Sequence, residues 1–594
     1  KSQSEPQWSP DGKQIAFCAL REGDSDAQVY VIDVAGGEAR RLSNTFSGLS
    51  ALRWCPDGKS LIAIQWRWPE LAGEVAQAKN KKDRAALKTS PHVTESAVYR
   101  YWDHWLTDGR VPQLVRVRMN GKVEPLMNKA QFLPLTEPSR LDYALAPDGM
   151  AVAYVQPRNR DSMLDPCDII WLDLRTKKAV AISPTEGAFS CASPSISPDG
   201  TLIAYTQSQP RDITHNAQLQ VYSRKHKTHQ RLAAGWDRSF GTYGHFHSSW
   251  QGNDALIFTA EDMGRSNLYR LLLDAETPEV LLKGGSVESF SHNHYGLLAT
   301  VASMKHPSQL FAVTPKGVRR LDAFNQFLNT KTLGEVEELT LPGYADEPVH
   351  AWVCYPPNYQ KGQRYPLLQN IHGGPHAAHL DTWHYRWNAQ AFAAQGYVVV
   401  MVNYHGSSSY GDAFIGSIDG SLGKREYADI EAFSDHFVNK KIADKNRLFA
   451  AGGSYGGYMV AYMNGQAKKP RYRAMVCHAG VYDWFGQFSD DCAEFWRYEL
   501  GTDIWDNLPH IQTQNPAAFA ANFNTPTLVI HGELDYRVPY YQGLQYYNTL
   551  KVKGVPSRLL VYADENHWIL KPQNSRQWYT EFFAWLRRFD TATA

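Results

Sequence analysis

The sequence lacks any run of eighteen or more apolar residues, so no transmembrane helix is expected. It also lacks a charge excess, because 61 Lys and Arg nearly balance 60 Asp and Glu, and a net charge of +1 gives no sign of a nucleic-acid partner. Cysteine is scarce and scattered. The seven cysteines show no Cys-x-x-Cys spacing, and their odd number leaves at least one unpaired. The sequence therefore predicts neither a disulfide framework nor a zinc site.

The start of the chain is unusual. It begins with Lys1 rather than Met, and a motif that recurs downstream appears within the first twelve residues. We therefore expect that upstream sequence has been removed, which would hide a signal peptide. A length of 594 residues with 43% apolar content exceeds one comfortable core, so two domains are expected.

A turn followed by a strand recurs through the N-terminal half. Four copies carry Pro-Asp-Gly before an alternating apolar run, with prolines at positions 10, 56, 147 and 198, and residues 250–254 begin a degenerate fifth copy. Pro-Asp-Gly makes the turn and the apolar run makes the strand. Repeats of about 50 residues predict β-propeller blades, whereas a β-sandwich would not explain a repeated turn. We expect a propeller over residues 1–330, with seven blades when intact and the first one incomplete.

The C-terminal half contains Gly-Gly-Ser-Tyr-Gly-Gly at residues 452–457, between an apolar strand pattern and a helix pattern. Small residues two before and two after Ser454 permit the sharp strand-to-helix turn of a nucleophile elbow. Such a turn leaves the serine hydroxyl near a helix N-terminus, which favours an oxyanion. A bare Gly-x-Ser-x-Gly also occurs in ordinary glycine-rich turns, so the surrounding sequence has to decide.

An acid and a histidine follow Ser454 in the order that α/β-hydrolases use. Asp535 lies just past a buried-strand pattern at residues 527–532, and His567 lies in the loop after a second one at residues 558–562. A neutral imidazole can take the serine proton, and a carboxylate can fix its tautomer and stabilise the imidazolium. We predict Ser454 as nucleophile, His567 as general base and Asp535 as the acid that orients it.

An earlier strand pattern, residues 365–371, ends in His372-Gly373-Gly374-Pro375. Glycines there let backbone N–H groups face a ligand. An oxyanion hole needs two converging donors, commonly the residue after the nucleophile and one from this early loop. We assign the N–H groups of Tyr455 and Gly374 to it. The alternative is a tight turn with no catalytic part.

With these motifs the sequence resembles the prolyl oligopeptidase family of serine peptidases, nearest its dipeptidyl peptidase V and acylaminoacyl peptidase branch. Residues 403–407 are similar to the family's Asn-Tyr-Arg-Gly-Ser segment, although His405 stands where Arg is commoner. We do not expect this departure to touch catalysis. The resemblance implies an α/β-hydrolase domain over residues 331–594, covered by the N-terminal β-propeller, and an acyl-enzyme mechanism without a cofactor.

The resemblance also implies where a substrate binds. Arg537 matches an arginine that binds the carbonyl next to the scissile residue. Trp484, Tyr458 and Val538 stand where the family lines an apolar pocket for the first residue, although such aromatics can equally belong to the core.

A long interval separates the second and third repeats. Within it, residues 97–110 resemble the Arg-x-Trp-Asp-x-Trp-x-Asp-Gly segment of the dipeptidyl peptidase V branch. Because aminopeptidases of the family hold the substrate's free amine with an acidic group on the propeller side, Asp103 and Glu95 are candidates for that role. The alternative is that the tryptophans pack a blade and Asp103 caps a turn.

These features predict a serine exopeptidase that releases dipeptides from the N-terminus of short peptides. The alternatives are an acylaminoacyl peptidase or esterase-like hydrolase with the same triad, and a protein-binding propeller beside a vestigial hydrolase, which the intact triad disfavours. Short peptides are the expected partners, without nucleic acid or membrane, and a homodimer stays open. We expect a periplasmic or secreted location, with the cytoplasm as the alternative.

Paired histidines invite a different interpretation. His245 and His247, like His292 and His294, are spaced to share a strand face, so four imidazoles could in principle converge on a metal. We predict no metal, because hydrogen bonding by histidines across a propeller is the commoner outcome.

Overall fold

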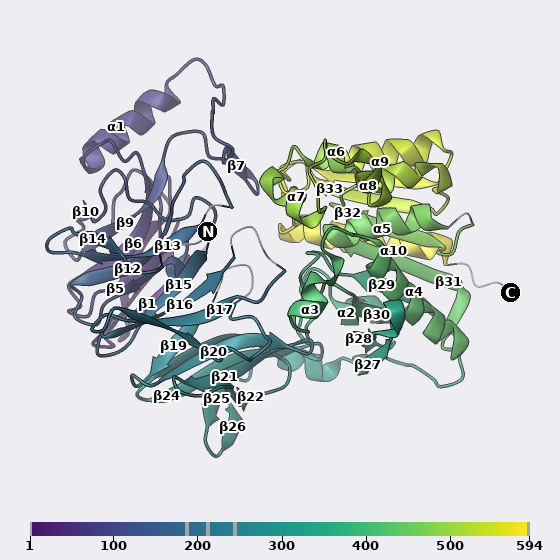
Figure 1. Ribbon diagram of the computed structural model, residues 1–594, viewed down its shortest axis with the longest axis horizontal. Helices are drawn as coiled ribbons and strands as arrows, with labels where there is room; N and C mark the ends of the chain where they lie inside the picture. Colours follow the sequence, from purple (N-terminus) through teal and green to yellow (C-terminus); the bar gives the residue numbers. More distant parts are fainter. Residues whose placement is uncertain are drawn as a thin grey trace.

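The computed structural model describes residues 3–164, 166–184, 189–209, 214–241, 246–467 and 469–590. Two groups of elements lie side by side (Figure 1). The N-terminal group, purple to teal, is built mainly of strands. The C-terminal group, green to yellow, has helices on both faces of one sheet.

The N-terminal strands form six consecutive four-stranded antiparallel units, the last two joined by a parallel pairing of β21 with β23. Their strands are β1 (Gln3–Trp8), β2 (Gln14–Ala19), β3 (Gln28–Asp33), β4 (Arg40–Arg41), β5 (Leu49–Trp54), β6 (Ser60–Arg67), β9 (Val111–Arg118), β10 (Val123–Pro125), β11 (Tyr143–Leu145), β12 (Ala151–Pro157), β13 (Cys167–Asp173), β14 (Ala179–Ala181), β15 (Ser190–Ile196), β16 (Leu202–Ser208), β17 (Gln218–Ser223), β18 (Thr228–Leu232), β19 (Ser248–Gln251), β20 (Ala255–Asp262), β21 (Arg265–Leu272), β22 (Glu279–Leu282), β23 (Ser286–Asn293), β24 (Gly296–Ser303), β25 (His306–Thr314) and β26 (Gly317–Arg320).

These units are the blades of a β-propeller, as the repeats predict. First strands of successive blades contact one another, for example β1 with β5 and β15 with β19. The glycines of the four Pro-Asp-Gly turns have φ between +65° and +73°, a conformation that glycine adopts without strain. The first blade has all four strands, so the expectation of an incomplete first blade is wrong. Six blades lie within the described residues, and the seventh stays a prediction.

An insertion in the second blade fills the long interval between repeats. Between β6 and β9 the chain forms helix α1 (Gly73–Ala85) and a small hairpin of β7 (Arg100–Tyr101) and β8 (His104–Trp105). This hairpin reaches from the propeller to the C-terminal group (Figure 1).

The C-terminal group is an α/β-hydrolase domain. Its eight strands are ordered β27-β28-β30-β29-β31-β32-β33-β34, and the six from β30 to β34 in that order are parallel. They are β27 (Val336–Pro342), β28 (Pro348–Cys354), β29 (Tyr365–Ile371), β30 (Val398–Asn403), β31 (Ala443–Gly453), β32 (Ala474–His478), β33 (Thr527–Gly532) and β34 (Ser557–Tyr562).

Apolar cores lie on both faces of this sheet. One face is covered by α2 (Ala389–Ala393) and α10 (Pro572–Phe589), and the other by α4 (Lys424–Asn439), α5 (Tyr455–Gln466) and α9 (Tyr541–Val552). The shorter helices are α3 (Asp412–Ile415), α6 (Trp484–Gln487), α7 (Trp496–Glu499) and α8 (Leu508–Thr513). Because the central strands are parallel, the loops after β31, β33 and β34 emerge at one edge, where α/β sheets place their sites.

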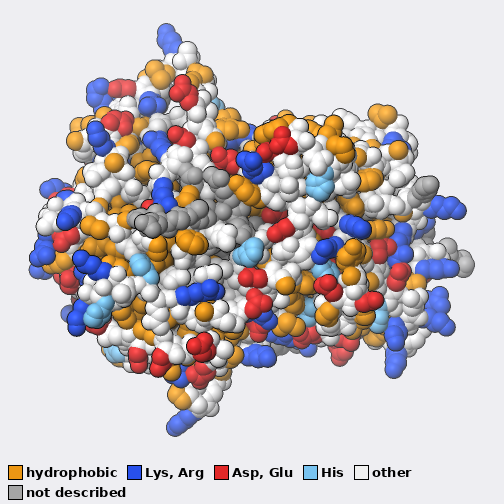
Figure 2. Space-filling view, viewed as in Figure 1, with side chains coloured by type: hydrophobic (Ala, Val, Ile, Leu, Met, Phe, Trp, Pro, Cys, Tyr) orange, Lys and Arg blue, Asp and Glu red, His pale blue; other side chains and the backbone are white. Residues whose placement is uncertain are grey.

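The last strand of the propeller, β26, ends at Arg320, and the first strand of the hydrolase sheet, β27, begins at Val336. The boundary drawn after residue 330 falls in this stretch and stays a prediction. In the described part of the chain, no helix is long and apolar enough to cross a membrane. Acidic and basic side chains are mixed over the visible surface (Figure 2), in keeping with the small net charge.

Candidate active site

Ser454 occupies the turn between β31 and α5. It has φ +58° and ψ −123°, a conformation that residues other than glycine rarely adopt. Its N–H donates to the His478 carbonyl at 3.0 Å. A Cβ on Gly456 would lie 2.2 Å from the Ile371 carbonyl oxygen, so only glycine permits this turn to pack against β29. The strained serine between close-packed glycines is the geometry of a nucleophile elbow.

The structure brings Asp535 and His567 together from the loops after β33 and β34. His567 Nδ1 and Asp535 Oδ2 are 2.7 Å apart, and both side chains are buried. The other carboxylate oxygen accepts from the N–H groups of Arg537 and Val538 at 3.0 and 2.9 Å. Burial alone would raise the pKa of Asp535, but His567 and His531 outweigh it and hold that pKa well below its usual range. Asp535 is therefore a carboxylate that fixes the Nδ1–H tautomer of His567.

His478, which the sequence reasoning missed, supports two parts of this arrangement. It ends β32, and its carbonyl accepts the Ser454 N–H. Trp578 Nε1 donates to its Nδ1 at 3.1 Å, so its Nε2 carries the proton and donates to the His567 carbonyl at 3.2 Å. Burial lowers the pKa of His478 to about 3, which keeps it neutral. Its position at the end of an apolar strand pattern was the only signal in the sequence.

The two predicted oxyanion donors lie near the elbow. Tyr455 is the first residue of α5, where a backbone N–H has no acceptor within the helix. Its hydroxyl donates to buried Glu426. The Gly373-Gly374 loop packs against the nucleophile, because a Cβ on Gly373 would lie 3.1 Å from Ser454 Cβ. The role of the Tyr455 and Gly374 N–H groups in the oxyanion hole stays a prediction.

The residues predicted to line the first-residue pocket are deeply buried. Trp484, Tyr458 and Val538 are each 2% exposed or less and belong to one core cluster. The indole N–H of Trp484 and the hydroxyl of Tyr458 both donate to the Gln514 carbonyl at 2.8 Å. They pack as core residues here, and their contact with a substrate stays a prediction.

Arg537 is held at the contact between the domains. Its Nε and Asp491 Oδ1 are 2.6 Å apart, and the guanidinium lies over the rings of Tyr101 and Trp102, 5.4 and 5.0 Å from their centroids. Asp491 was not predicted from the sequence. It also accepts the Trp102 N–H at 2.6 Å, so one carboxylate binds both the arginine and the propeller hairpin.

The two acids proposed to hold a free amine lie in different settings. Asp103 sits at the tip of the β7–β8 hairpin, with its side chain 38% exposed, and accepts from Asn566 Nδ2 at 2.7 Å. Asn566 directly precedes His567, so Asp103 is close to the catalytic loop. Glu95 is exposed in the segment between α1 and β7. Within the described contacts, nothing joins Glu95 to the triad.

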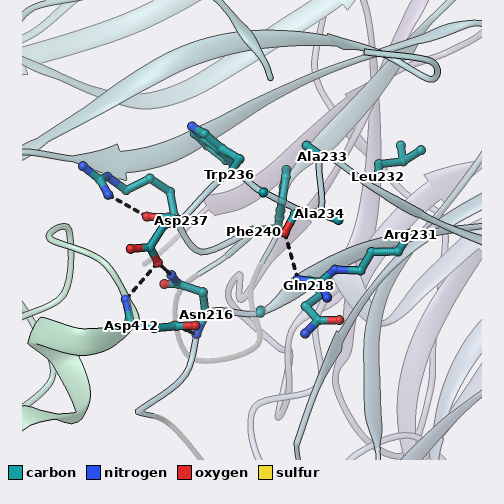
Figure 3. A pocket seen from close by; sticks show the side chains of 13 residues that line it. Asn216, Gln218, Arg231, Leu232, Ala233, Ala234, Trp236, Asp237, Phe240 and Asp412 are labelled. Atoms are coloured by element: carbon teal, nitrogen blue, oxygen red, sulfur yellow. Dashed lines mark hydrogen bonds between the residues drawn. The ribbon is translucent and has the colours of Figure 1, made fainter. Parts of the chain in front are cut away.

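A separate cavity of about 180 Å³ lies where the propeller meets α3 (Figure 3). Asp237 accepts there from the Asp412 N–H at 2.9 Å and from Asn216 Nδ2 at 2.8 Å. None of the triad residues lines it. It therefore marks a second contact between the domains and lies apart from the triad.

Among the residues that the structure describes, no group of three or more His, Cys, Asp or Glu side chains is placed to hold a metal ion, and the absence of a metal stays a prediction. His245 lies outside the described residues. His247 is stacked on Phe290, with ring centroids 4.4 Å apart.

Comparison with known proteins agrees with this geometry. Residues 383–591 match the prolyl oligopeptidase family. Dipeptidyl-peptidase 5 of Schizosaccharomyces pombe is 30% identical, over 99% of this chain and 86% of that protein. Dipeptidyl-peptidase 5 of Porphyromonas endodontalis is 28% identical, over 98% and 85%. In structure, the chain resembles the Pyrococcus horikoshii acylaminoacyl peptidase with a TM-score of 0.81 at 19% identity, over 100% of this chain and 90% of the other, which supports the fold.

The chain belongs to the prolyl oligopeptidase family and is a serine peptidase with an α/β-hydrolase domain and an N-terminal β-propeller. The predictions of family, fold and enzyme class are confirmed.

Proposed function

We propose that this peptidase removes dipeptides from the free N-terminus of short peptides. The observation that carries the proposal is the Asp535–His567 pair next to an elbow serine, with an acid of the propeller at the same loop. That acid, Asp103, accepts a hydrogen bond from Asn566, the residue directly before His567. The relatives named dipeptidyl-peptidase 5, which align over nearly the whole chain, add support.

In the proposed mechanism, Ser454 Oγ attacks the scissile carbonyl while His567 Nε2 takes its proton. This nitrogen is available because the Nδ1–H is committed to Asp535. The Tyr455 and Gly374 N–H groups stabilise the tetrahedral oxyanion. His567 then protonates the leaving amine, and a water molecule activated by the same histidine releases the dipeptide from the acyl-enzyme. No cofactor takes part.

We propose that three further groups set the substrate's register. Asp103 holds the free amine by a charge-assisted hydrogen bond. Asp491 occupies Nε and Nη2 of Arg537, and the Nη1 side of that guanidinium binds the carbonyl next to the scissile residue. Trp484, Tyr458 and Val538 form the apolar pocket for the first residue.

The amine assignment is tested with Asp103→Asn. This variant removes the charge and keeps an oxygen for the Asn566 amide, so the histidine loop retains its hydrogen bond. We expect kcat/KM for a dipeptidyl fluorogenic amide to fall by roughly tenfold or more, in line with a charged hydrogen bond of about 1.5–3 kcal/mol. Hydrolysis of a simple ester without an amine should be unchanged. Glu95→Gln, measured alongside, tests the second acid in the same way.

The deciding quantity is the ratio of kcat/KM for the free dipeptidyl amide to that for its N-acetylated form. It should exceed one in the wild type and fall in Asp103→Asn. A ratio that neither variant changes would place the amine elsewhere and leave Asp103 as a structural residue of the hairpin.

An acylaminoacyl peptidase is the second candidate. The specific observation in its favour is that Asp103 is already engaged by Asn566 and lies 3.1 Å from His104 Nδ1, partners that compete with an amine. A wild-type preference for the acetylated substrate would select this function. A periplasmic or secreted location remains our proposal for the compartment, to be tested by fractionating the source cells.

A further inference from the structure

The β7–β8 hairpin turns at Trp102 and Asp103, and its backbone is strained there. Trp102 has φ +59°, a left-handed conformation that is unfavourable for a residue with a side chain. Two-residue hairpin turns prefer glycine or asparagine at such positions, so a tryptophan there is unusual. Strain of this kind persists where surrounding contacts hold it, and it concentrates at functional sites.

The contacts that hold Trp102 come from the two loops that carry Asp535 and His567, the acid–base pair. Its carbonyl accepts the Tyr536 N–H at 2.9 Å, directly after Asp535. Its indole meets the His567 imidazole edge-on, with ring centroids 5.5 Å apart, and Trp568 in the same manner at 4.8 Å. The neighbouring Asp103 accepts from Asn566, on the other side of His567 in the sequence. The hairpin thus bridges the loops that present Asp535 and His567.

His567 needs such support, because its loop contains no helix or strand from Ala563 to Lys571. Asp535 holds one ring nitrogen and His478 holds the carbonyl. These hydrogen bonds do not fix the faces and edges of the imidazole ring, which only packing against neighbouring side chains can hold in place. Trp102 supplies an aromatic ring there and leaves the imidazole 4% exposed.

We propose that Trp102 is a positioning residue for His567, so that the propeller completes the acid–base pair of the peptidase domain. It acts through the histidine: the indole edge limits rotation of the imidazole and keeps Nε2 directed at Ser454. A displacement of about 1 Å in such a group can cost on the order of 100-fold in rate. This inference rests on the proposed roles of Ser454 and His567.

The test uses Trp102→Gly in the full chain. Glycine adopts a positive φ without strain, so the variant removes the ring and keeps the turn. We expect kcat for a dipeptidyl amide to fall by roughly 10–100-fold with little change in KM. The rate at which a small alkyl fluorophosphonate labels Ser454 should fall by a similar factor, because that probe has no peptide to contact the hairpin. Trp102→Phe should recover most of both rates.

Trp105→Phe is the matched control from the same hairpin. Trp105 stacks on His92, with centroids 4.1 Å apart, and touches Tyr536 rather than His567. It should retain wild-type rates in both assays. If Trp102→Gly melts more than a few degrees below the wild type, Trp102→Asn, which tolerates a positive φ and carries no aromatic ring, replaces it in both assays with the same expectation.

Two results would overturn the inference. In one, labelling by the fluorophosphonate stays at the wild-type rate while KM for the peptide rises, which makes Trp102 a substrate contact only. In the other, both rates are unchanged. A wild-type enzyme that the probe fails to label would instead remove the proposed function, so the two failures are distinguishable.

Discussion

Replacing Asp491 should destabilise the protein, because it leaves the Arg537 guanidinium at the domain contact without a counter-charge. The Asp491 side chain is fully buried and that of Arg537 is 27% exposed, with Nε and Oδ1 2.6 Å apart. Removing one partner of a buried ion pair costs about 3–5 kcal/mol. Since the guanidinium keeps some contact with water, we expect about 2–3 kcal/mol for Asp491→Ala.

At roughly 2–3 °C per kcal/mol for a large domain, this loss corresponds to a fall of about 4–9 °C in Tm. The Tm of Asp491→Asn should fall less, because its amide oxygen still accepts the Trp102 N–H. The double variant Asp491→Ala with Arg537→Met should recover much of the loss, since replacing both members of a buried pair by apolar groups is often close to neutral.

The assay is differential scanning calorimetry at pH 7.5 and constant ionic strength. The control is Asp83→Ala, which breaks the exposed Lys79–Asp83 pair on α1 and should leave Tm within about 1 °C. A wild-type Tm in Asp491→Ala, or a double variant less stable than the single one, would refute the view that Asp491 compensates a buried charge.

Three other predictions concern the triad, the departure at residue 405 and the propeller. Ser454→Ala should lose roughly 10³-fold or more of its activity at an unchanged Tm, whereas Asp535→Asn should lose about 10⁴-fold by allowing the wrong tautomer of His567; a tenth of wild-type activity in either variant would contradict this. Burial alone would lower the pKa of His405, but Asp429 and Glu347 outweigh it and raise that pKa above its ordinary value. The resulting stabilisation is complete below the unfolded pKa of about 6.5 and is lost as pH rises through the folded pKa. The Tm of the wild type should therefore decline between pH 6 and 9. In His405→Arg, whose charge persists over this range, the decline should be less steep. The β7–β8 hairpin of the propeller packs against His567, so we expect peptides of a few residues to be cleaved while intact casein and folded proteins are left alone. Digestion of a folded protein, followed by electrophoresis, would argue against this exclusion by size.

The sequence predicted those parts of the site that local motifs specify. Ser454 lies between glycines whose spacing is typical of a nucleophile elbow. Asp535 and His567 each follow a buried-strand pattern. In a parallel sheet the carboxyl ends of strands meet at one edge, where the structure brings Asp535 and His567 together; a contact of the Ser454 hydroxyl with His567 stays a prediction. The propeller was predictable for a similar reason, because its repeated Pro-Asp-Gly turns are local.

The remainder depends on contacts between distant parts of the chain. His478 could be placed beside the elbow only once the register of β32 against β31 was known. Asp491 and Trp102 are 389 positions apart, and no local pattern marks that pair. The error over the first blade had a similar origin. β1 precedes the first Pro-Asp-Gly turn, at the very start of the given sequence, and its residues show no alternating apolar pattern that would mark a strand.

The contacts of the hairpin also bear on how a substrate reaches Ser454. On one side of the interface, Trp102 and Asp103 are bound to Asp491, Tyr536 and Asn566. On the other side, near α3, the propeller is tied to the peptidase domain through Asp237 and Asp412. Separation of the domains at the hairpin would break the hydrogen bonds of Trp102 and Asp103 and remove the Trp102 ring from His567. Separation near α3 would also break hydrogen bonds, including that from the Asp412 N–H to Asp237, but none of the contacts between Asp535 and His567. Opening on the α3 side would therefore disturb the Asp535–His567 pair less than opening at the hairpin.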